Sequence, residues 1–206
     1  MASGRRLLIP LGGPGQWDAR VVGGKAAKLA ELSLAGFDVP QGFCLTTRAY
    51  EAFVNDAGIA AAISMELGRK SMDDMRWEEI WDTALRIRAR FLAQPLSGSL
   101  RETVAAGLRG FDAGASLAVS SSAVGEDSAG RSFAGLHESI IGVRGRQAVE
   151  DAIRLVWASL WSDAALLYRK ELGLDPAHSR MAVLVQEMVD ADPSGVAFAR
   201  DPRDTR

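Results

Sequence analysis

The chain has 206 residues, of which 48% are hydrophobic and 24% charged, a composition that excludes a disordered protein. Its formal net charge of -2 lacks the basic excess of nucleic-acid-binding proteins, and no apolar run reaches the roughly 18–20 residues of a membrane helix. The single cysteine, Cys44, lies in an apolar run, so we expect a small buried side chain and a reducing, cytoplasmic setting.

Residues 1–114 predict a mainly helical part. Apolar spacing, turn residues and capping residues together indicate a strand at Leu7–Ile9, a helix from Gly24 to Ala35, a short buried strand at Phe43–Leu45, and helices at Thr47–Asn55, Arg76–Gln94 and Leu100–Phe111. The helix Arg76–Gln94 has the clearest amphipathic pattern. We expect its inward stripe to hold Trp77, Ile80, Trp81, Ala84 and Phe91.

Residues 115–206 have a different sequence pattern. They predict a strand at Leu117–Val119, a polar segment through Gly135, a strand at Ser139–Val143, one long helix over Gln147–Lys170, and a strand pair at Met181–Met188 and through Phe198. The polar segment indicates a long loop between two strands. Loops of this length in compact domains are uncommon and often functional.

The first candidate site is Val22-Gly23-Gly24-Lys25 at a predicted helix start. Glycines let a backbone approach a ligand, and free N–H groups at a helix N-terminus attract anions. The alternative is a glycine turn followed by a surface lysine. The spacing is not that of a Walker A motif.

Two further segments could bind a nucleotide. The loop that ends at Gly135, with Ser139 beyond it, could fold over a polyphosphate, or it could be an ordinary solvated hairpin. The strand Val183–Val189 could bind a flat base at its polar tip, although buried strands often end this way. His137 and His178 indicate surface positions, and no Cys/His cluster has metal-ligand spacing.

These segments together resemble the N-terminal ATP-binding domain of the phosphoenolpyruvate synthase, pyruvate phosphate dikinase and rifampicin phosphotransferase family. The resemblance runs from Val21 to Pro202. It rests on Val22–Lys25, Val39–Phe43, Thr46–Tyr50, Ser121–Ala123, Glu126-Asp127, Ser132–Gly135, Trp157–Trp161, Tyr168-Arg169, Ser194–Val196 and Asp201-Pro202. The stretch Gly42–Thr47 looks most like the rifampicin phosphotransferase branch.

The resemblance implies the N-terminal lobe of an ATP-grasp-like α/β fold, with helices packed on a small mixed sheet. It also implies a mechanism in which ATP phosphorylates a histidine on a swivelling domain, which passes the phosphoryl group to pyruvate or to an antibiotic. By position, Lys25 would contact the ATP phosphates, and Gly135 and Ser139 would belong to the loop that covers them. The adenine pocket would be lined by Gln186, Glu187, Met188 and Val189.

One departure concerns a phosphate contact. The family's strand usually reads Val-Arg-Ser-Ser-Ala, whereas here it reads Val119-Ser120-Ser121-Ser122-Ala123. Ser120 therefore stands in the place of a phosphate-binding arginine, whose charged, bidentate fork a serine cannot supply.

A second departure from the family pattern concerns the Mg²⁺ ligands and the phosphorylated histidine. The family's Mg²⁺ ligands lie in a second lobe that we expect outside this chain, and neither His137 nor His178 matches the phosphorylated histidine. We therefore assign no catalytic residue here and expect residues 1–206 to be a partial ATP-binding domain that works with further domains or a partner chain. The alternative is a degenerate standalone domain that acts as a non-catalytic interaction or regulatory module.

Overall fold

The computed structural model describes residues 6–12, 17–124, 136–193 and 195. Within these ranges the strands are β1 (Leu8–Pro10), β2 (Gly42–Leu45), β3 (Leu117–Ala123), β4 (Ser139–Val143) and β5 (Met181–Glu187). The helices are α1 (Ala19–Leu34), α2 (Thr47–Asp56), α3 (Ile59–Leu67), α4 (Trp77–Ala93), α5 (Gly98–Leu108), α6 (Arg146–Ser159) and α7 (Asp163–Glu171), with 3-10 turns η2 (Met72–Asp74) and η3 (Pro176–His178). The second strand of the expected C-terminal pair, through Phe198, lies outside the described residues.

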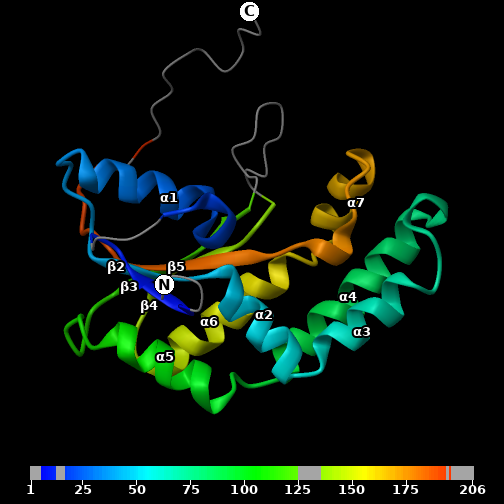
Figure 1. Ribbon diagram of the computed structural model, residues 1–206, viewed down its shortest axis with the longest axis horizontal. Coiled ribbons are helices and arrows are strands. Elements are labelled where there is room, and N and C mark those ends of the chain that lie inside the picture. Colours follow the sequence, from blue (N-terminus) through cyan, green and yellow to red (C-terminus); the bar gives the residue numbers. More distant parts are fainter. Residues whose placement is uncertain (1–5, 13–16, 125–135, 194, 196–206) are drawn as a thin grey trace, which may run out of the picture.

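The strands form one sheet in the order β1-β2-β5-β3-β4, and each of these neighbouring pairs is antiparallel. The α/β class with helices packed on a sheet is confirmed and is consistent with an ATP-grasp-like N-terminal lobe. The pairings that the structure describes are antiparallel, however, where a mixed sheet was expected. Strands from the helical first half and from the second half of the chain share this sheet (Figure 1).

Helices cover the two faces of the sheet unequally. α1 covers one face alone, over a small apolar cluster that includes Val22, Ala26, Cys44 and Leu184. The other face packs on the main core, to which α2, α4, α5 and α6 contribute (Figure 1). Alternation along the strands explains this split, because successive side chains of a strand point to opposite faces. Cys44 is fully buried, as predicted.

The main core centres on stacked and edge-to-face aromatic rings. Phe53 stacks on Trp157 with ring centroids 5.2 Å apart, and Tyr50 stacks on Phe91 at 6.0 Å. The Tyr50 hydroxyl accepts a hydrogen bond of 2.9 Å from the indole N–H of Trp161, so the polar edges of these two buried rings satisfy each other.

The inward stripe of α4 differs from the prediction. Ile80, Ala84 and Phe91 are buried as expected, but Trp77 is 58% and Trp81 46% exposed. Their places on the packed side are taken by residues such as Ile87, because α4 is wedged between α3, α6 and α7. The hydrophobic pattern therefore predicted an inward stripe that wrongly includes Trp77 and Trp81.

The single helix predicted over Gln147–Lys170 is two helices, so this expectation is wrong. α6 ends at Ser159, and Ser162 begins α7 by accepting a hydrogen bond of 3.1 Å from the Ala165 N–H. The hydroxyl of Ser162 is a strong N-cap that favours a new helix start. The helix α3 had no counterpart in the prediction.

Candidate functional site

The glycine pair of the first candidate site breaks α1. Gly23 has φ 76° and ψ 168°, a conformation that essentially only glycine adopts, and the helix resumes at Gly24. A Cβ atom on Gly23 would lie 2.0 Å from the backbone oxygen of Ser122. Gly23 is therefore required for the chain to turn while its backbone touches β3.

A serine on β3 caps the resumed helix. The hydroxyl of Ser122, fully buried, accepts a hydrogen bond of 3.1 Å from the Ala26 N–H and donates one of 2.7 Å to the Val22 carbonyl oxygen. It thus satisfies backbone groups on both sides of the break at Gly23. The sequence analysis did not predict this contact, because the cap comes from a strand far along the chain.

Lys25 lies on the exposed side of this helix start. Its charge helps to lower the pKa of His137, in the segment leading into β4. Within the described residues Lys25 forms no salt bridge. The ammonium group is thus available to an anion that approaches the N-terminus of the resumed helix.

Ser120 and Ser139 lie beside α1 on the same side of the sheet. Ser120 pairs with Leu184, whose side chain belongs to the cluster under α1, and Ser139 is the partner of Ser120 on the other side. Ser120 is half-buried and Ser139 is exposed. Two small hydroxyl side chains therefore border α1 on the β4 side. Gly135, the other predicted loop residue, lies outside the described residues.

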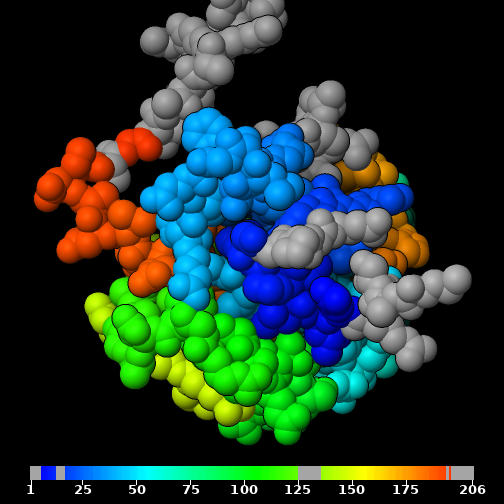
Figure 2. All heavy atoms as spheres, turned by 60° about the vertical axis from the view of Figure 1, so that its left-hand side comes forward, coloured from blue at the N-terminus to red at the C-terminus, as the bar shows by residue number. Residues whose placement is uncertain are grey.

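The predicted adenine-binding residues lie at the opposite end of this face. Gln186 follows Ala182, which pairs with Ser122, by four residues along β5, a distance of roughly 13 Å at the usual strand rise. Figure 2 shows the segment after β5, in orange-red, at the surface beside the light-blue segment that follows α1. The Gln186 amide donates a hydrogen bond of 3.0 Å to the Pro40 carbonyl oxygen, which joins the two segments.

Some backbone groups of this tip are already bonded. The N–H groups of Glu187 and Met188 donate to the carbonyl oxygens of Gln41 and Ser116, at 2.8 and 2.9 Å. The Met188 sulfur accepts a hydrogen bond of 3.0 Å from the Gly142 N–H, while Val189 is exposed. A base bound here would have to use the carbonyl oxygens and apolar surfaces that remain.

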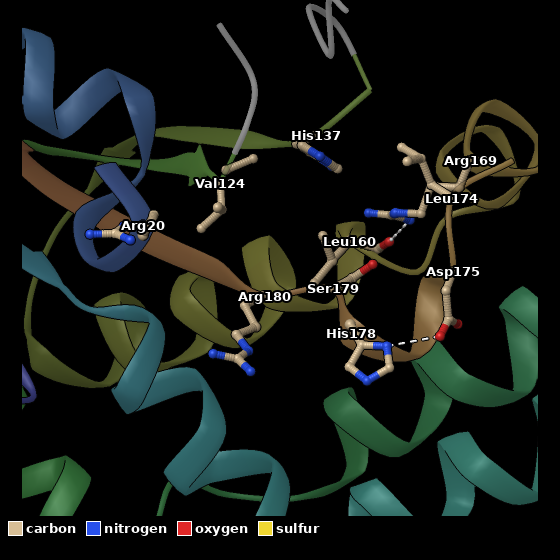
Figure 3. A pocket seen from close by; sticks show the side chains of 11 residues that line it. Arg20, Val124, His137, Leu160, Arg169, Leu174, Asp175, His178, Ser179 and Arg180 are labelled. Carbon is tan, nitrogen blue, oxygen red and sulfur yellow. Dashed lines mark hydrogen bonds and ion pairs between the residues drawn. The ribbon is translucent and has the colours of Figure 1, made fainter. Parts of the chain in front are cut away.

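A basic cavity of about 480 Å³ opens where β3 ends (Figure 3). Its walls come from the start of α1, the end of β3, the segment before β4, α7 and the turn around η3. The lining residues are Arg20, Ala123, Val124, His137, Leu160, Arg169, Leu174, Asp175, His178, Ser179 and Arg180.

Arg169 is the most deeply buried cation of this cavity. The residue is 4% exposed, and its guanidinium donates hydrogen bonds to the carbonyl oxygens of Leu160 (2.7 Å) and Ala165 (3.2 Å). No carboxylate in the described part of the chain pairs with it, and burial lowers its pKa to about 10. A buried charge without a counter-ion favours binding of an anion.

His137 lines this cavity and is not the surface residue that the sequence indicated. It is half-buried, and its pKa is lowered to about 4, first by desolvation and then by the Arg169 charge, with a smaller contribution from Lys25. His178 is exposed as expected, and its ring lies 2.8 Å from the Asp175 carboxylate. The imidazole of His137 is therefore neutral near pH 7.

The cavity was not predicted from the sequence, although Tyr168-Arg169 was part of the family resemblance. The available signal was an arginine that shares the inward side of α7 with Ala165 and Leu166, where a charge needs a reason to be buried. Among the described residues there is no group of three or more His, Cys, Asp or Glu that could hold a metal ion. In the same ranges no helix is long and apolar enough to cross a bilayer.

The α/β domain thus has a helix start opened by glycines, a lysine beside it and a cavity lined mostly by cations, groups that attract anions. The chain belongs to the family described as the pyruvate phosphate dikinase AMP/ATP-binding domain, whose model matches residues 19–206. This confirms the family resemblance seen in the sequence.

The relatives that are similar to the chain include phosphoenolpyruvate synthases and rifampicin phosphotransferases. A phosphoenolpyruvate synthase of Aeropyrum pernix is 38% identical over 203 residues, covering 96% of this chain and 25% of the relative. A rifampicin phosphotransferase of Streptomyces sviceus is 39% identical over 186 residues, covering 88% of this chain and 21% of the relative. The phosphoenolpyruvate synthase of Escherichia coli is 36% identical, with 91% and 24% covered. The chain thus spans about a quarter of the length of these relatives, and the similar identities do not separate the two branches.

Proposed function

We propose that the chain is the ATP-binding part of a dikinase-type phosphotransferase. In this proposal a histidine on a swivelling domain outside the chain receives the phosphoryl group and passes it to pyruvate or to an antibiotic such as rifampicin. The observation that carries the proposal is the buried Arg169, which has no carboxylate partner among the described residues and lines one cavity with Arg20 at the α1 start, because this arrangement suits a polyphosphate.

We expect ATP to lie along the face of the sheet that α1 covers. Phosphates would lie from Ser120, in the middle of β3, toward Lys25 and the basic cavity at the strand end, and the base at the Gln186–Val189 tip. ATP would supply the phosphoryl group, and these residues would bind and orient it. Mg²⁺, expected with ATP, would depend on ligands outside this chain, since the described residues offer no such cluster. A cytoplasmic location stays a prediction from the sequence.

Ser120 supports a second candidate, a degenerate domain that acts as an interaction or regulatory module without turnover. Its hydroxyl replaces a permanently charged side chain, and the loss of one charged hydrogen bond to phosphate costs about 1.5–3 kcal/mol. Affinity for ATP should then fall roughly ten- to a hundredfold. A module that has lost its ligand altogether would show no ATP binding, and that outcome distinguishes it from the first candidate.

The test is calorimetric titration of the chain with ATP. We expect binding weaker than about 1 μM, further weakened roughly tenfold or more by Lys25→Ala, because the lysine charge is lost. Lys28→Ala is the matched control, since Lys28 is an exposed lysine on the same helix that pairs with Glu31. A folded chain that shows no heat with millimolar ATP, or equal effects of the two substitutions, would refute the proposal.

A further inference from the structure

His137 and Arg169 approach the same cavity from different elements. Figure 3 shows the ring of His137 and the guanidinium of Arg169 on one side of the cavity, next to the end of β3 at Val124. His137 comes from the segment before β4, whereas Arg169 comes from α7. A ligand that reached the buried arginine would therefore meet the imidazole as well.

The backbone next to His137 is held by two neighbours. The Glu138 N–H donates a hydrogen bond of 3.1 Å to the Ser159 hydroxyl, which itself donates one of 2.7 Å to the Val156 carbonyl oxygen. The Glu138 carboxylate lies 3.4 Å from the Arg88 guanidinium of α4. The acid nearest to His137 in sequence is therefore drawn toward Arg88 and does not neutralise the cavity.

The remaining charges around the cavity are mostly positive. Arg169 of α7 and Lys25 of α1 both act on the His137 ring. Arg20 and Arg180 line the walls and are paired with Asp18 and Glu51 respectively, which lie outside the lining. The lining contains one acid among the described residues, Asp175, and this carboxylate is paired with His178.

We propose that His137 is a phosphate-binding residue whose imidazole takes up one proton from solvent when a phosphate group occupies the cavity, and then donates a hydrogen bond to that group. This inference rests on the proposed function, because the phosphate is taken to belong to ATP. It adds a residue to which the sequence analysis gave no role. Arg169 and Lys25 would hold the same anion by charge.

The physical basis is the balance of charges at the ring. Desolvation, Arg169 and, least, Lys25 lower the pKa of His137 to about 4 in the free protein, against a hydrogen bond to the Ser159 backbone that raises it. A phosphate anion would offset both cations and pair with the imidazolium, and an opposite charge within about 4–6 Å typically moves a pKa by roughly 1–3 units. The bound state would thus have the higher pKa.

This rise in the pKa of His137 fixes the direction in which pH changes the affinity for ATP. A group whose pKa rises on binding strengthens binding fully below its free pKa, and this gain is lost as pH rises through the bound pKa. The window therefore extends upward from about pH 4. Within it, affinity should fall by up to about tenfold per pH unit, in addition to the change caused by the titration of ATP itself.

The experiment measures proton uptake when the 206-residue chain binds ATP. Calorimetric titrations near pH 6 in two buffers of different ionisation enthalpy give the protons taken up per ATP. His137→Gln keeps a polar, neutral side chain of similar reach, and Lys28→Ala, a substitution outside the cavity lining, is the control. We expect wild type and Lys28→Ala to take up the same fraction of a proton, and His137→Gln to take up less.

A second readout does not depend on His137→Gln being folded. The chain has two histidines, so comparison with His178→Gln assigns the imidazole NMR signals of His137 in the wild-type chain. Inorganic tripolyphosphate should move these signals toward the protonated form, as ATP does, whereas adenosine should not. That difference assigns the proton to phosphate rather than to the base.

The outcomes separate the two proposals. ATP binding with equal proton uptake in wild type and His137→Gln, or His137 signals that do not move with tripolyphosphate, would overturn the role of His137 and leave the proposed function standing. A folded wild-type chain that binds no ATP would overturn the proposed function itself, and the role of His137 with it.

Discussion

Substitution of Gly23 by alanine tests whether the glycine pair is primarily structural. The added Cβ would lie 2.0 Å from the Ser122 backbone oxygen and 2.4 Å from its hydroxyl oxygen. Neither atom can rotate away freely, because Ser122 belongs to β3 and its hydroxyl bonds to Val22 and Ala26. α1 and β3 would have to separate locally.

Two costs add up in this variant. Holding a non-glycine residue at φ 76° and ψ 168° costs of order 1–3 kcal/mol, and overpacking a buried contact typically costs a further 1–3 kcal/mol. We therefore expect the free energy of unfolding to fall by about 2–6 kcal/mol. For a domain of this size that corresponds to a melting temperature lower by roughly 4–24 °C.

The assay is urea and thermal unfolding followed by tryptophan fluorescence, which the fully buried Trp157 will report. Gly98→Ala is the control, because Gly98 starts α5 at negative φ with open space around its Cβ position. That change should leave stability unchanged or raise it by up to about 1 kcal/mol. A Gly23→Ala protein that melted within about 2 °C of wild type would refute the packing argument.

Three further predictions concern the same region. Ser122→Ala should lower the free energy of unfolding by about 1–3 kcal/mol, because Val22 and Ala26 lose a buried partner, whereas Ser121→Ala, on the opposite face, should cost less in the same urea titration. Ser120→Arg should restore a phosphate contact and tighten ATP binding in a salt-sensitive way; lower stability without tighter binding would contradict the placement of Ser120 beside the phosphates. The chain alone should transfer no label from γ- or β-labelled ATP with Mg²⁺, and a stable phosphohistidine at either histidine would contradict that expectation.

Local patterns predicted the elements whose signals lie within a few residues. The strand at Phe43–Leu45 and the helix at Thr47–Asn55 are confirmed within one residue at each end, because a buried run and a helix start adjoin there. The break between α6 and α7 was not visible. Leu160 and Trp161 are apolar and continue the helical spacing, which hid the one local signal for the break, the Ser162 N-cap of α7.

The candidate site was also predictable only in part. Lys25 and its glycines could be singled out from four adjacent residues, and the family resemblance added their candidate role. The cavity could not be predicted, because His137 and Arg169 come from separate segments that only the folded chain brings together. Ser122 is a similar case, since nothing near it in sequence indicates that its hydroxyl caps a helix formed about a hundred residues earlier.

The unequal covering of the two sheet faces has a dynamic consequence. α1 is anchored by a small cluster of mostly small side chains, whereas the opposite face shares the large aromatic core. Segments with few buried apolar contacts open locally at a lower free energy than the whole domain unfolds. The amide hydrogens of α1 should therefore exchange with solvent faster than those of α6. Because the proposed phosphate contact lies at the start of this helix, a bound nucleotide would slow that exchange most strongly between Gly24 and Ala30.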